Sequence, residues 1–376
     1  MPASTWRADM QAMAASTSSI TLTPAEEHRL EVMDFQRRHA RFVTAARVAI
    51  PIVLLLAIAQ SINAVFSTST GTHHLQPAPI TSGVAIVTGG GGGIGREIAV
   101  ALGVAGLDVV VAVRPSSVAK YTAQTASLWA ERGATGAWYI EPVDLANATS
   151  VATFVERVQA TYGSRTRILV NNAAAPAQRD DASVRHTSVD GMLNEFQVDV
   201  WAYWYLMTRL QPTLARNAPS SVVNIASTMA TKPNLDDVQY EHTPFLSLHA
   251  YSAYKAAERM LTWEAAARYN HSGVMYNAVH PGVVAGTGMS PKGALSSIGS
   301  MVDSPAHAAA RAADLAQNAT AFGYTATWWE MSTGRASVSE LKPCGSRKPF
   351  SFCDPHLRQR LWAYVEEVDA ALTTRS

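Results

Sequence analysis

The fold of this chain is decided by the stretch VAIVTGGGGGIGREIAVAL, residues 84–102. Five consecutive glycines on their own are typical of a flexible linker. Here, however, a short β-branched run precedes them and a segment with helical spacing follows them. A strand that turns tightly into a helix leaves free backbone N–H groups at the positive end of that helix. Because glycine lets the backbone approach a phosphate closely, the stretch predicts a site for a phosphate-bearing ligand.

The alternation of strand and helix continues along the chain. Apolar runs of strand length alternate with helical segments of about 10–15 residues, which predicts an α/β fold with a doubly wound parallel sheet. In such a sheet the ligand lies at the carboxyl ends of the strands. The predicted strands are residues 83–89, 107–114, 137–145, 166–173, 220–227 and 274–282, and the predicted helices are residues 96–106, 117–133, 150–163, 189–216 and 250–269.

The N-terminal part of the chain differs from the rest in composition. Residues 1–22 are rich in Ala, Ser, Thr and Met without a lasting period, and we expect them to be disordered. Residues 23–66 are predicted to form a basic helix that leads into a transmembrane anchor at the uncharged residues 48–66. That segment would span roughly 28 Å as a helix, close to the thickness of a bilayer's hydrocarbon core. The alternative is a buried core helix or an interfacial hairpin.

The charges on either side of residues 48–66 are asymmetric. Five arginines lie between residues 29 and 47, and the next Lys or Arg after the segment is Arg96. The positive-inside rule therefore predicts a cytosolic N-terminus with the rest of the protein across the membrane. Glycosylation sequons at Asn147, Asn270 and Asn318 would report this topology. Residues 67–82 are predicted to be a linker, and residues 83–376 the doubly wound domain with a C-terminal helical tail.

Composition limits the classes of function. Hydrophobic residues make up 48% of the chain, and the formal net charge of +1 provides no field that would recruit nucleic acid. The two cysteines, Cys344 and Cys353, show no metal-ligand or redox spacing, and we expect no metal site. A disulfide between them and two free thiols both remain open.

The motifs together resemble the short-chain dehydrogenase/reductase family, which has a Rossmann-type fold. The resemblance covers about residues 83–290, and its motifs follow the family's order on the expected elements. It includes the family's NNAG motif, in which Ala174 replaces the last glycine. The matching segments are TGGGGGIG at 88–95, Asp144-Leu145, NNAA at 171–174, Ser227, YSAYK at 251–255 and HPGVV at 280–284.

Further segments are similar to the retinol-dehydrogenase-like branch of this family. They are residues 190–214, the long stretch between Ser227 and Tyr251, and, more loosely, residues 358–368. The resemblance implies a membrane-anchored enzyme, for which we expect the endoplasmic reticulum. It also implies a lipophilic small-molecule substrate, an alcohol or carbonyl such as a retinoid, sterol or lipid aldehyde. The family often pairs through the helices that carry Asp199 and Tyr251, so we expect that a homodimer can form there.

Three residues of the resemblance carry acid–base chemistry. Tyr251 and Lys255 are four residues apart and lie on the same face of the predicted helix. A tyrosine is a poor acid–base group at neutral pH, but a lysine cation beside it favours the phenolate and lowers the tyrosine pKa. Ser227 can hydrogen-bond a substrate oxygen and stabilise the charge that develops on it. We predict Tyr251 as the acid–base, Lys255 as its activator and Ser227 as the oxyanion stabiliser.

The predicted cofactor is NADP(H). NAD-specific enzymes place an acidic residue at the end of the second strand, whereas this chain has Val113 followed by Arg114. An arginine there can pair with a 2′-phosphate, and Arg96 is expected to help. The alternative is that Arg114 is merely exposed and either cofactor is accepted. The predicted cofactor-binding residues are Gly89, Gly93, Ile94, Gly95, Arg96, Arg114, Asp144, Leu145, Asn171, Ala173, Tyr251, Lys255, Pro281, Gly282 and Val283.

One position departs from the family in a way that bears on catalysis. The family usually has an asparagine, part of a proton relay to the lysine, where this chain has Asp199. An ionised carboxylate cannot donate a hydrogen bond and places a negative charge near Lys255. We expect the relay to persist with Asp199 as an altered member. Asp199 and Ala174 also support the alternative of a catalytically weak or inactive scaffold that binds NADP(H) as a sensor.

Residues 232–250 form a stretch too long for a tight turn, next to the predicted site. Loops of this length are often functional lids, and their apolar side chains suit a lipophilic pocket. Ordinary packing of the loop on the domain is the alternative.

Overall fold

The computed structural model describes residues 79–175, 182–282, 284, 304–322, 325–332, 335–339 and 354–374. All of them belong to the second of the two units into which the chain divides, Gly71–Ser376. The predicted disordered segment and anchor, most of the predicted linker, Val283 and both cysteines therefore lie outside the described residues. No helix in the described ranges is long and apolar enough to cross a membrane.

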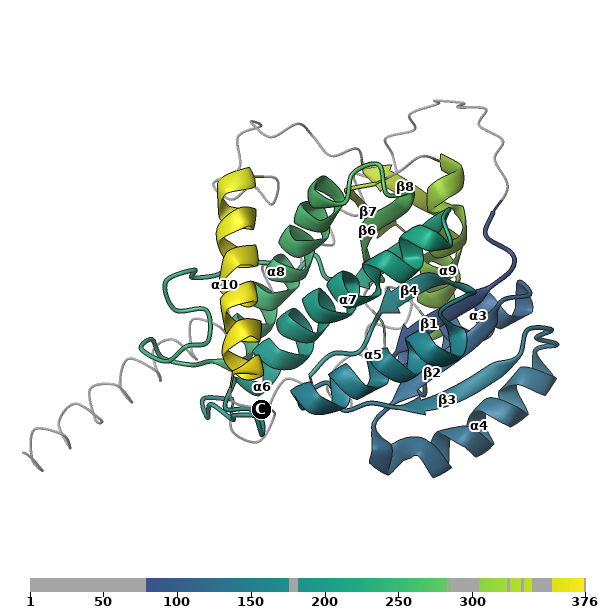
Figure 1. The fold of residues 1–376 in the computed structure, drawn as a ribbon, viewed down its shortest axis with the longest axis horizontal. Helices are drawn as coiled ribbons and strands as arrows, with labels where there is room; N and C mark the ends of the chain where they lie inside the picture. The colour runs from purple at the N-terminus through teal and green to yellow at the C-terminus, as the bar shows by residue number, and fades with distance from the viewer. Residues whose placement is uncertain are drawn as a thin grey trace, which may run out of the picture. The chain divides into compact units, whose positions relative to one another are not determined.

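The domain is built on an eight-stranded sheet (Figure 1) with the order β3-β2-β1-β4-β5-β6-β7-β8. Neighbouring strands from β3 to β7 are parallel, and β8 is antiparallel to β7. The prediction of a doubly wound parallel sheet is thus confirmed. The strands are β1 (Val84–Thr88), β2 (Asp108–Val113), β3 (Trp138–Pro142), β4 (Thr166–Asn171), β5 (Ser220–Ile225), β6 (Val274–His280), β7 (Thr327–Ser332) and β8 (Arg335–Ser339).

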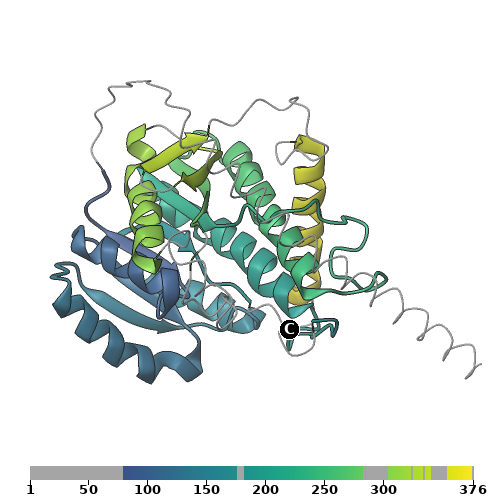
Figure 2. The ribbon, with the colours of Figure 1, turned by 180° about the vertical axis from the view of Figure 1, so that it is seen from behind.

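Helices cover both faces of the sheet, as the two opposite views show (Figures 1 and 2). One face carries α3 (Gly93–Val104), α4 (Val118–Glu131) and α9 (Pro305–Phe322), with the short helix η1 (Pro115–Ser117) before α4. The other face carries α5 (Ala148–Tyr162), α6 (Asn194–Phe196), the π-helical turn Gln197–Trp201, α7 (Ala202–Arg216) and α8 (Ser247–Arg268). A last helix, α10 (Pro355–Thr373), packs against α8.

Each face of the sheet has its own apolar core, because side chains alternate across every strand. In β1, Val84 and Ile86 belong to the core under α5, α7 and α8, whereas Ala85 and Val87 belong to the core under α3 and α9. A strand that is buried on both faces has apolar residues at almost every position. The run VAIV therefore predicts a buried strand reliably.

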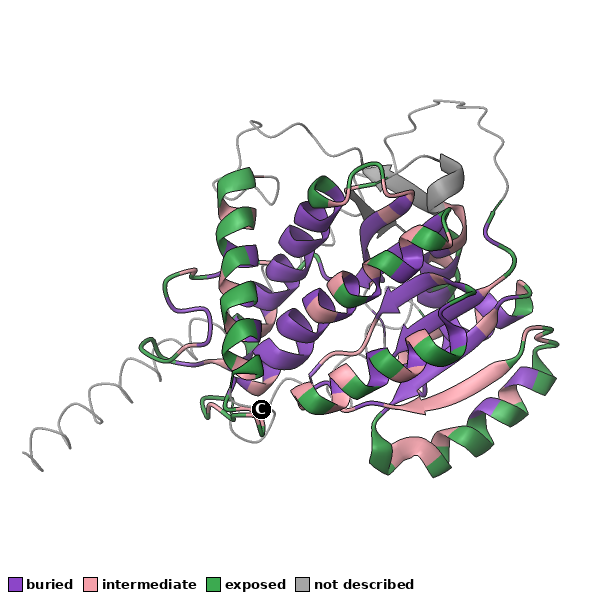
Figure 3. Ribbon diagram, in the orientation of Figure 1, coloured by how far each residue is buried: buried purple, intermediate pink, exposed green. Residues whose placement is uncertain are grey.

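Helix α8 is more buried than its surface-like sequence indicates (Figure 3). The sheet covers one side of it, and α10 covers another. Trp362 of α10 is almost fully buried, and its ring centroid lies 6.2 Å from that of Tyr269 and 5.9 Å from that of Trp204. The Arg268 guanidinium lies 4.7 Å from the Trp362 ring centroid. A homodimer through the helices of Asp199 and Tyr251 remains a prediction, and α10 packs against the second of these helices.

The structure differs from the sequence prediction in three respects. The predicted helix 189–216 begins only at Asn194 and contains the π-helical turn Gln197–Trp201. The segments α9, β7 and β8 were not predicted and extend the sheet beyond β6. Ile80, at the end of the predicted linker, is buried, and its N–H donates to the Gln317 carbonyl of α9 at 2.9 Å.

The long loop before α8 is packed on the domain. Tyr240 and Phe245 lie edge to face with centroids 5.8 Å apart, and the Tyr254 hydroxyl donates to the Val238 carbonyl at 2.9 Å. The Asp237 carboxylate accepts hydrogen bonds from three backbone N–H groups and the Thr243 hydroxyl. These contacts favour ordinary packing over a mobile lid for this part of residues 232–250.

Candidate active site

The strand order predicts a crevice at the carboxyl ends of β1 and β4. The chain leaves β1 toward β2 on one side and returns to β4 on the other, so the two following loops diverge. Ligands of doubly wound sheets bind at such a switch point. The glycine turn after β1, residues 172–175 after β4 and Ser227 after β5 all start from this edge.

The glycine turn is tied to the end of β4 by side-chain hydrogen bonds. The Thr88 hydroxyl accepts from the N–H groups of Asn172 and Ala173 at 2.9 and 3.1 Å. The Asn172 amide donates to the Thr88 carbonyl at 2.9 Å. Gly89 and Gly93 have φ angles of +64° and +55°, which favour glycine. The turn is therefore a fixed structure and not a linker.

The close packing of this turn explains Gly95. A Cβ on Gly95 would lie 2.4 Å from the Gly89 carbonyl oxygen and 2.3 Å from the Asn172 amide nitrogen. At Gly91 the nearest atom to a Cβ is on the half-buried Tyr121 ring, at 2.3 Å. A Cβ on Gly95 would thus meet both the Gly89 backbone and the Asn172 amide that holds the turn, whereas the three atoms nearest to a Cβ on Gly91 all belong to the Tyr121 ring.

The start of α3 is open to an anion. Its N-cap is Gly92, no side chain caps it, and its first turn has no acidic residue. Unpaired N–H groups and the positive helix end suit a pyrophosphate. A cradle that a Cβ would fill and an uncapped helix start together fit the diphosphate of a nicotinamide dinucleotide.

The other predicted cofactor residues around this crevice differ in their exposure and in their hydrogen-bond and ion-pair partners. Arg114 directly follows β2 and is exposed. Arg96 is half-buried and pairs with Glu97 at 3.0 Å, so part of its charge is already matched. Asp144 accepts the Ala146 N–H at 3.0 Å, and Leu145 beside it is buried.

Asn171 is part of a buried hydrogen-bond chain. Its amide donates to Asn224 of β5 at 2.9 Å, the Asn224 amide donates to the Thr262 hydroxyl at 2.7 Å, and that hydroxyl donates to the Glu258 carbonyl at 2.6 Å. This chain joins β4, β5 and α8 beneath the crevice. The Asn171 side chain therefore supports the site from within, while Pro281 and Gly282 follow β6 at the same edge of the sheet.

Ser227, Tyr251 and Lys255 come together at the end of β5. A side-chain hydrogen bond joins Ser227 and Tyr251. The Lys255 ammonium lies 5.7 Å from the Tyr251 ring centroid and donates to the Ile225 carbonyl at 3.2 Å. Spacing of four residues on α8 and the strand end of β5 thus produce the arrangement that the sequence predicts.

The electrostatics of this trio follow from burial and pairing. Burial raises the pKa of Tyr251, while the Lys255 cation and the hydrogen bond from Ser227 lower it. Burial alone would lower the pKa of Lys255, but the carboxylates of Glu258 and Asp199 raise it above its ordinary value. Lys255 is therefore a firmly charged cation beside the phenol.

Asp199 lies in the π-helical turn and is buried. Its carboxylate accepts the Ala175 N–H at 2.9 Å. Burial raises its pKa to about 6, and the nearby Lys255 cation opposes that shift. A π-turn is frequent at functional sites and here directs a carboxylate toward the lysine.

The comparison with known sequences decides the family. Residues 83–294 match the family model described as short chain dehydrogenase. The chain belongs to this family. The predicted resemblance is thereby confirmed, and oxidoreductase chemistry with a nicotinamide cofactor is the starting point for the function proposed below.

Individual relatives of this short chain dehydrogenase match over part of their length. Dehydrogenase/reductase SDR family member FEY of Arabidopsis thaliana is 32% identical over 205 residues, 52% of this chain and 54% of that protein. Retinol dehydrogenase 13 of Mus musculus is 31% identical over 210 residues, 55% of this chain and 60% of that protein. The chain thus spans less than two thirds of either relative.

A solved structure supports the fold of this short chain dehydrogenase. It is described as L-sorbose reductase of Gluconobacter frateurii in complex with NADPH and L-sorbose. The TM-score is 0.52 at 19% identity, covering 67% of this chain and 95% of that chain. At this identity the likeness concerns the fold alone.

Two residues that touch Lys255 were missed by the sequence analysis. Glu258 pairs with the Lys255 ammonium at 2.6 Å, and the Tyr203 ring centroid lies 5.8 Å from it. The Tyr203 hydroxyl donates to the Ala173 carbonyl at 2.8 Å. The sequence shows only that Glu258 follows Lys255 by three residues on one predicted helix. Because this spacing is equally common for pairs on exposed helix surfaces, it does not predict a buried ion pair.

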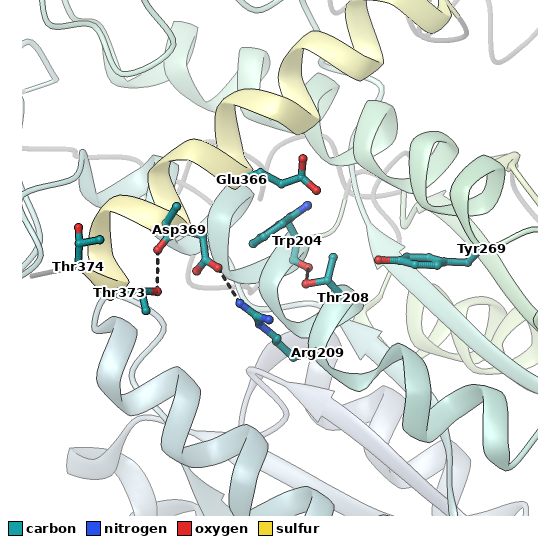
Figure 4. A pocket seen from close by; sticks show the side chains of 9 residues that line it. Trp204, Thr208, Arg209, Tyr269, Glu366, Asp369, Thr373 and Thr374 are labelled. Carbon is teal, nitrogen blue, oxygen red and sulfur yellow. Dashed lines mark hydrogen bonds and ion pairs between the residues drawn. The ribbon is translucent and has the colours of Figure 1, made fainter. Parts of the chain in front are cut away.

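A cavity of about 570 Å³ lies away from this trio, where α7 meets α10 (Figure 4). An ion pair of 2.8 Å between Arg209 and Asp369 crosses it. None of Ser227, Tyr251 and Lys255 is among its lining residues. Its lining residues are Trp204, Thr208, Arg209, Tyr269, Glu366, Asp369, Ala370, Thr373 and Thr374.

Gly95→Ala should weaken NADPH binding much more than Gly91→Ala. We expect at least about a tenfold rise in Kd for Gly95→Ala, about 1.4 kcal/mol, because the new methyl group meets backbone. For Gly91→Ala, adding Tyr121→Ala should restore affinity. Titration of NADPH fluorescence measures both, and equal losses in the two single variants would contradict this account of the turn.

Asp199→Asn should preserve or raise turnover. The asparagine carbonyl oxygen can still accept the Ala175 N–H, while the negative charge near Lys255 disappears. Steady-state kcat at neutral pH measures the effect. A large loss of kcat in a folded variant would show that the carboxylate has a specific role.

Proposed function

We propose that the protein is an NADP(H)-dependent oxidoreductase that interconverts an alcohol and a carbonyl on a lipophilic small molecule. The observation that carries this proposal is the contact of Ser227 with Tyr251 above the buried Lys255 cation, at the edge of the sheet where ligands bind. A phenol, a hydroxyl and a cation at one point are the groups that proton transfer to an alkoxide requires.

The nicotinamide, when bound, supplies or accepts the hydride. In carbonyl reduction the substrate oxygen gains negative charge, and the Ser227 hydroxyl can donate a hydrogen bond to it. The Tyr251 hydroxyl then gives its proton to that oxygen. The Lys255 ammonium stabilises the phenolate that remains, and the same residues act in reverse when an alcohol is oxidised.

The proposal of NADP(H) rests on charge at the end of β2. Arg114 is exposed there with no acidic residue beside it in sequence, and its planar guanidinium suits a phosphate. Arg96 shares its charge with Glu97 and is the weaker candidate for this contact.

The proposal of a lipophilic substrate rests on exposed apolar side chains close to the trio in sequence. Met229 and Leu248 are 46% and 37% exposed, two residues after Ser227 and three before Tyr251. The Met229 N–H donates to the Ser227 hydroxyl at 3.0 Å, so this side chain starts at the site. Large exposed apolar side chains at a polar site suit an apolar substrate body.

We also propose that residues 48–66 anchor the enzyme in a membrane, with the endoplasmic reticulum as the expected location and the N-terminus in the cytosol. The uncharged run and the arginines before it support this proposal. A lipophilic substrate would be available to an enzyme held at that surface.

Tyr251→Phe should abolish most turnover while leaving the fold and cofactor binding intact. The loss of the proton donor should lower kcat by about 100-fold or more. NADPH consumption with a panel of lipophilic aldehydes and ketones measures it. If the wild-type protein binds NADPH but reduces no carbonyl, and Tyr251→Phe changes nothing in cells, the sensor alternative is correct.

Arg114→Ala should change the choice of cofactor. We expect KM for NADPH to rise about tenfold or more, the usual loss for a charge-assisted pair, with KM for NADH nearly unchanged. Arg165→Ala is the control, since Arg165 pairs with Asp108 at the amino ends of the strands. A wild-type preference for NADH would refute the assignment.

A further inference from the structure

Glu258 forms a buried ion pair with Lys255, the residue that is proposed to activate Tyr251. The carboxylate oxygen and the ammonium nitrogen are 2.6 Å apart, and the side chains are 0% and 4% exposed. The geometry is that of a short charge-assisted hydrogen bond. Removing a carboxylate from water is costly. An apolar side chain at position 258 would therefore cost the fold less than this charge does.

The pair limits what Lys255 can do. An ammonium has three N–H donors, and two of them are directed to Glu258 and to the Ile225 carbonyl. One donor of the ammonium is left for another partner. The other Glu258 oxygen is buried without a hydrogen-bond partner in the described part of the chain, so the carboxylate is held mainly by the lysine.

The titratable groups around Glu258 lie on three elements. Lys255 and Tyr251 lie on α8, Asp199 on the π-helical turn and Tyr203 on α7. The neighbouring β5 contributes the Ile225 carbonyl through Lys255. The Glu258 and Asp199 carboxylates therefore both interact with the Lys255 cation. Both carboxylates raise the pKa of Tyr251, whereas the Lys255 cation lowers it.

We propose that Glu258 is a positioning residue of the active site. Its carboxylate holds the Lys255 ammonium in place and partly cancels the field of that ammonium on Tyr251, so that Tyr251 stays protonated to a higher pH. A protonated Tyr251 is the form that donates to a carbonyl, so Glu258 extends carbonyl reduction to more alkaline conditions. This inference rests on the proposed function, in which Tyr251 is the acid–base.

The pKa shifts agree with this geometry. Burial raises the pKa of Glu258, whereas the Lys255 cation opposes that shift and favours the ionised carboxylate. The ionised Glu258 in turn raises the pKa of Tyr251, as a like charge does. The sign is therefore fixed: removing the Glu258 charge must lower the pH at which Tyr251 loses its proton.

The test compares Glu258→Gln with wild-type protein, both as the full chain. The ionisation of Tyr251 is followed as tyrosinate absorbance, taken as the difference between each protein and its Tyr251→Phe counterpart. We expect the midpoint to fall by about one pH unit in Glu258→Gln, a tenfold change in acid dissociation constant. The alkaline limit of NADPH-dependent carbonyl reduction should fall with it.

Three further variants separate charge from shape. Glu258→Met, which fills similar space without a charge, should shift the midpoint in the same direction as Glu258→Gln. Glu258→Asp, which keeps the charge, should shift it less. Glu264→Gln is the control, because Glu264 is also buried on α8 but pairs with Arg268 at 2.9 Å, and it should leave the midpoint unchanged.

Two results would overturn the inference. One is a midpoint that stays in place in the two neutral variants, and the other is failure of both neutral variants to fold, which would assign Glu258 to the fold alone. The absorbance measurement needs no turnover. A wild-type protein without activity would therefore refute the proposed function and still allow the effect of Glu258 on Tyr251 to be measured.

Discussion

The Lys255 ammonium is a buried cation, and the elements around it are arranged to keep it charged. Removing an ammonium from water costs on the order of several kcal/mol unless other groups replace its hydration. Here the Ile225 carbonyl, the Glu258 carboxylate, the Asp199 charge and two tyrosine rings do so. They come from β5, α8, the π-helical turn and α7. Burying this one charge therefore requires that α7, α8, the π-helical turn and β5 all be in place.

The sequence predicts the parts of this fold that repeat a pattern. VAIV is buried on both faces, so its continuous apolar run clearly predicts a strand. The glycines between it and α3 allow the close packing of the turn. The trio of Ser227, Tyr251 and Lys255 was predictable because helical spacing and a strand end fix their positions.

Other parts depend on contacts that no local pattern reports. The π-turn at Asp199 shifts one residue of register within a segment whose sequence has ordinary helical spacing. The burial of Glu258 depends on α8 being packed against the π-helical turn, α7 and β5, since the same spacing with Lys255 on a free helix would be a surface pair. The place of β7 and β8 at the sheet edge follows from pairing with β6 and with each other.

The hydrogen-bond chain from Asn171 through Asn224 and Thr262 to the Glu258 carbonyl has a mechanical consequence. Its first member is adjacent to Asn172, which holds the glycine turn through Thr88. The seat for the diphosphate and the backbone that carries the buried cation are thus linked by short, directional bonds through the interior. A displacement of either would strain these bonds, so we expect the two halves of the candidate site to move together.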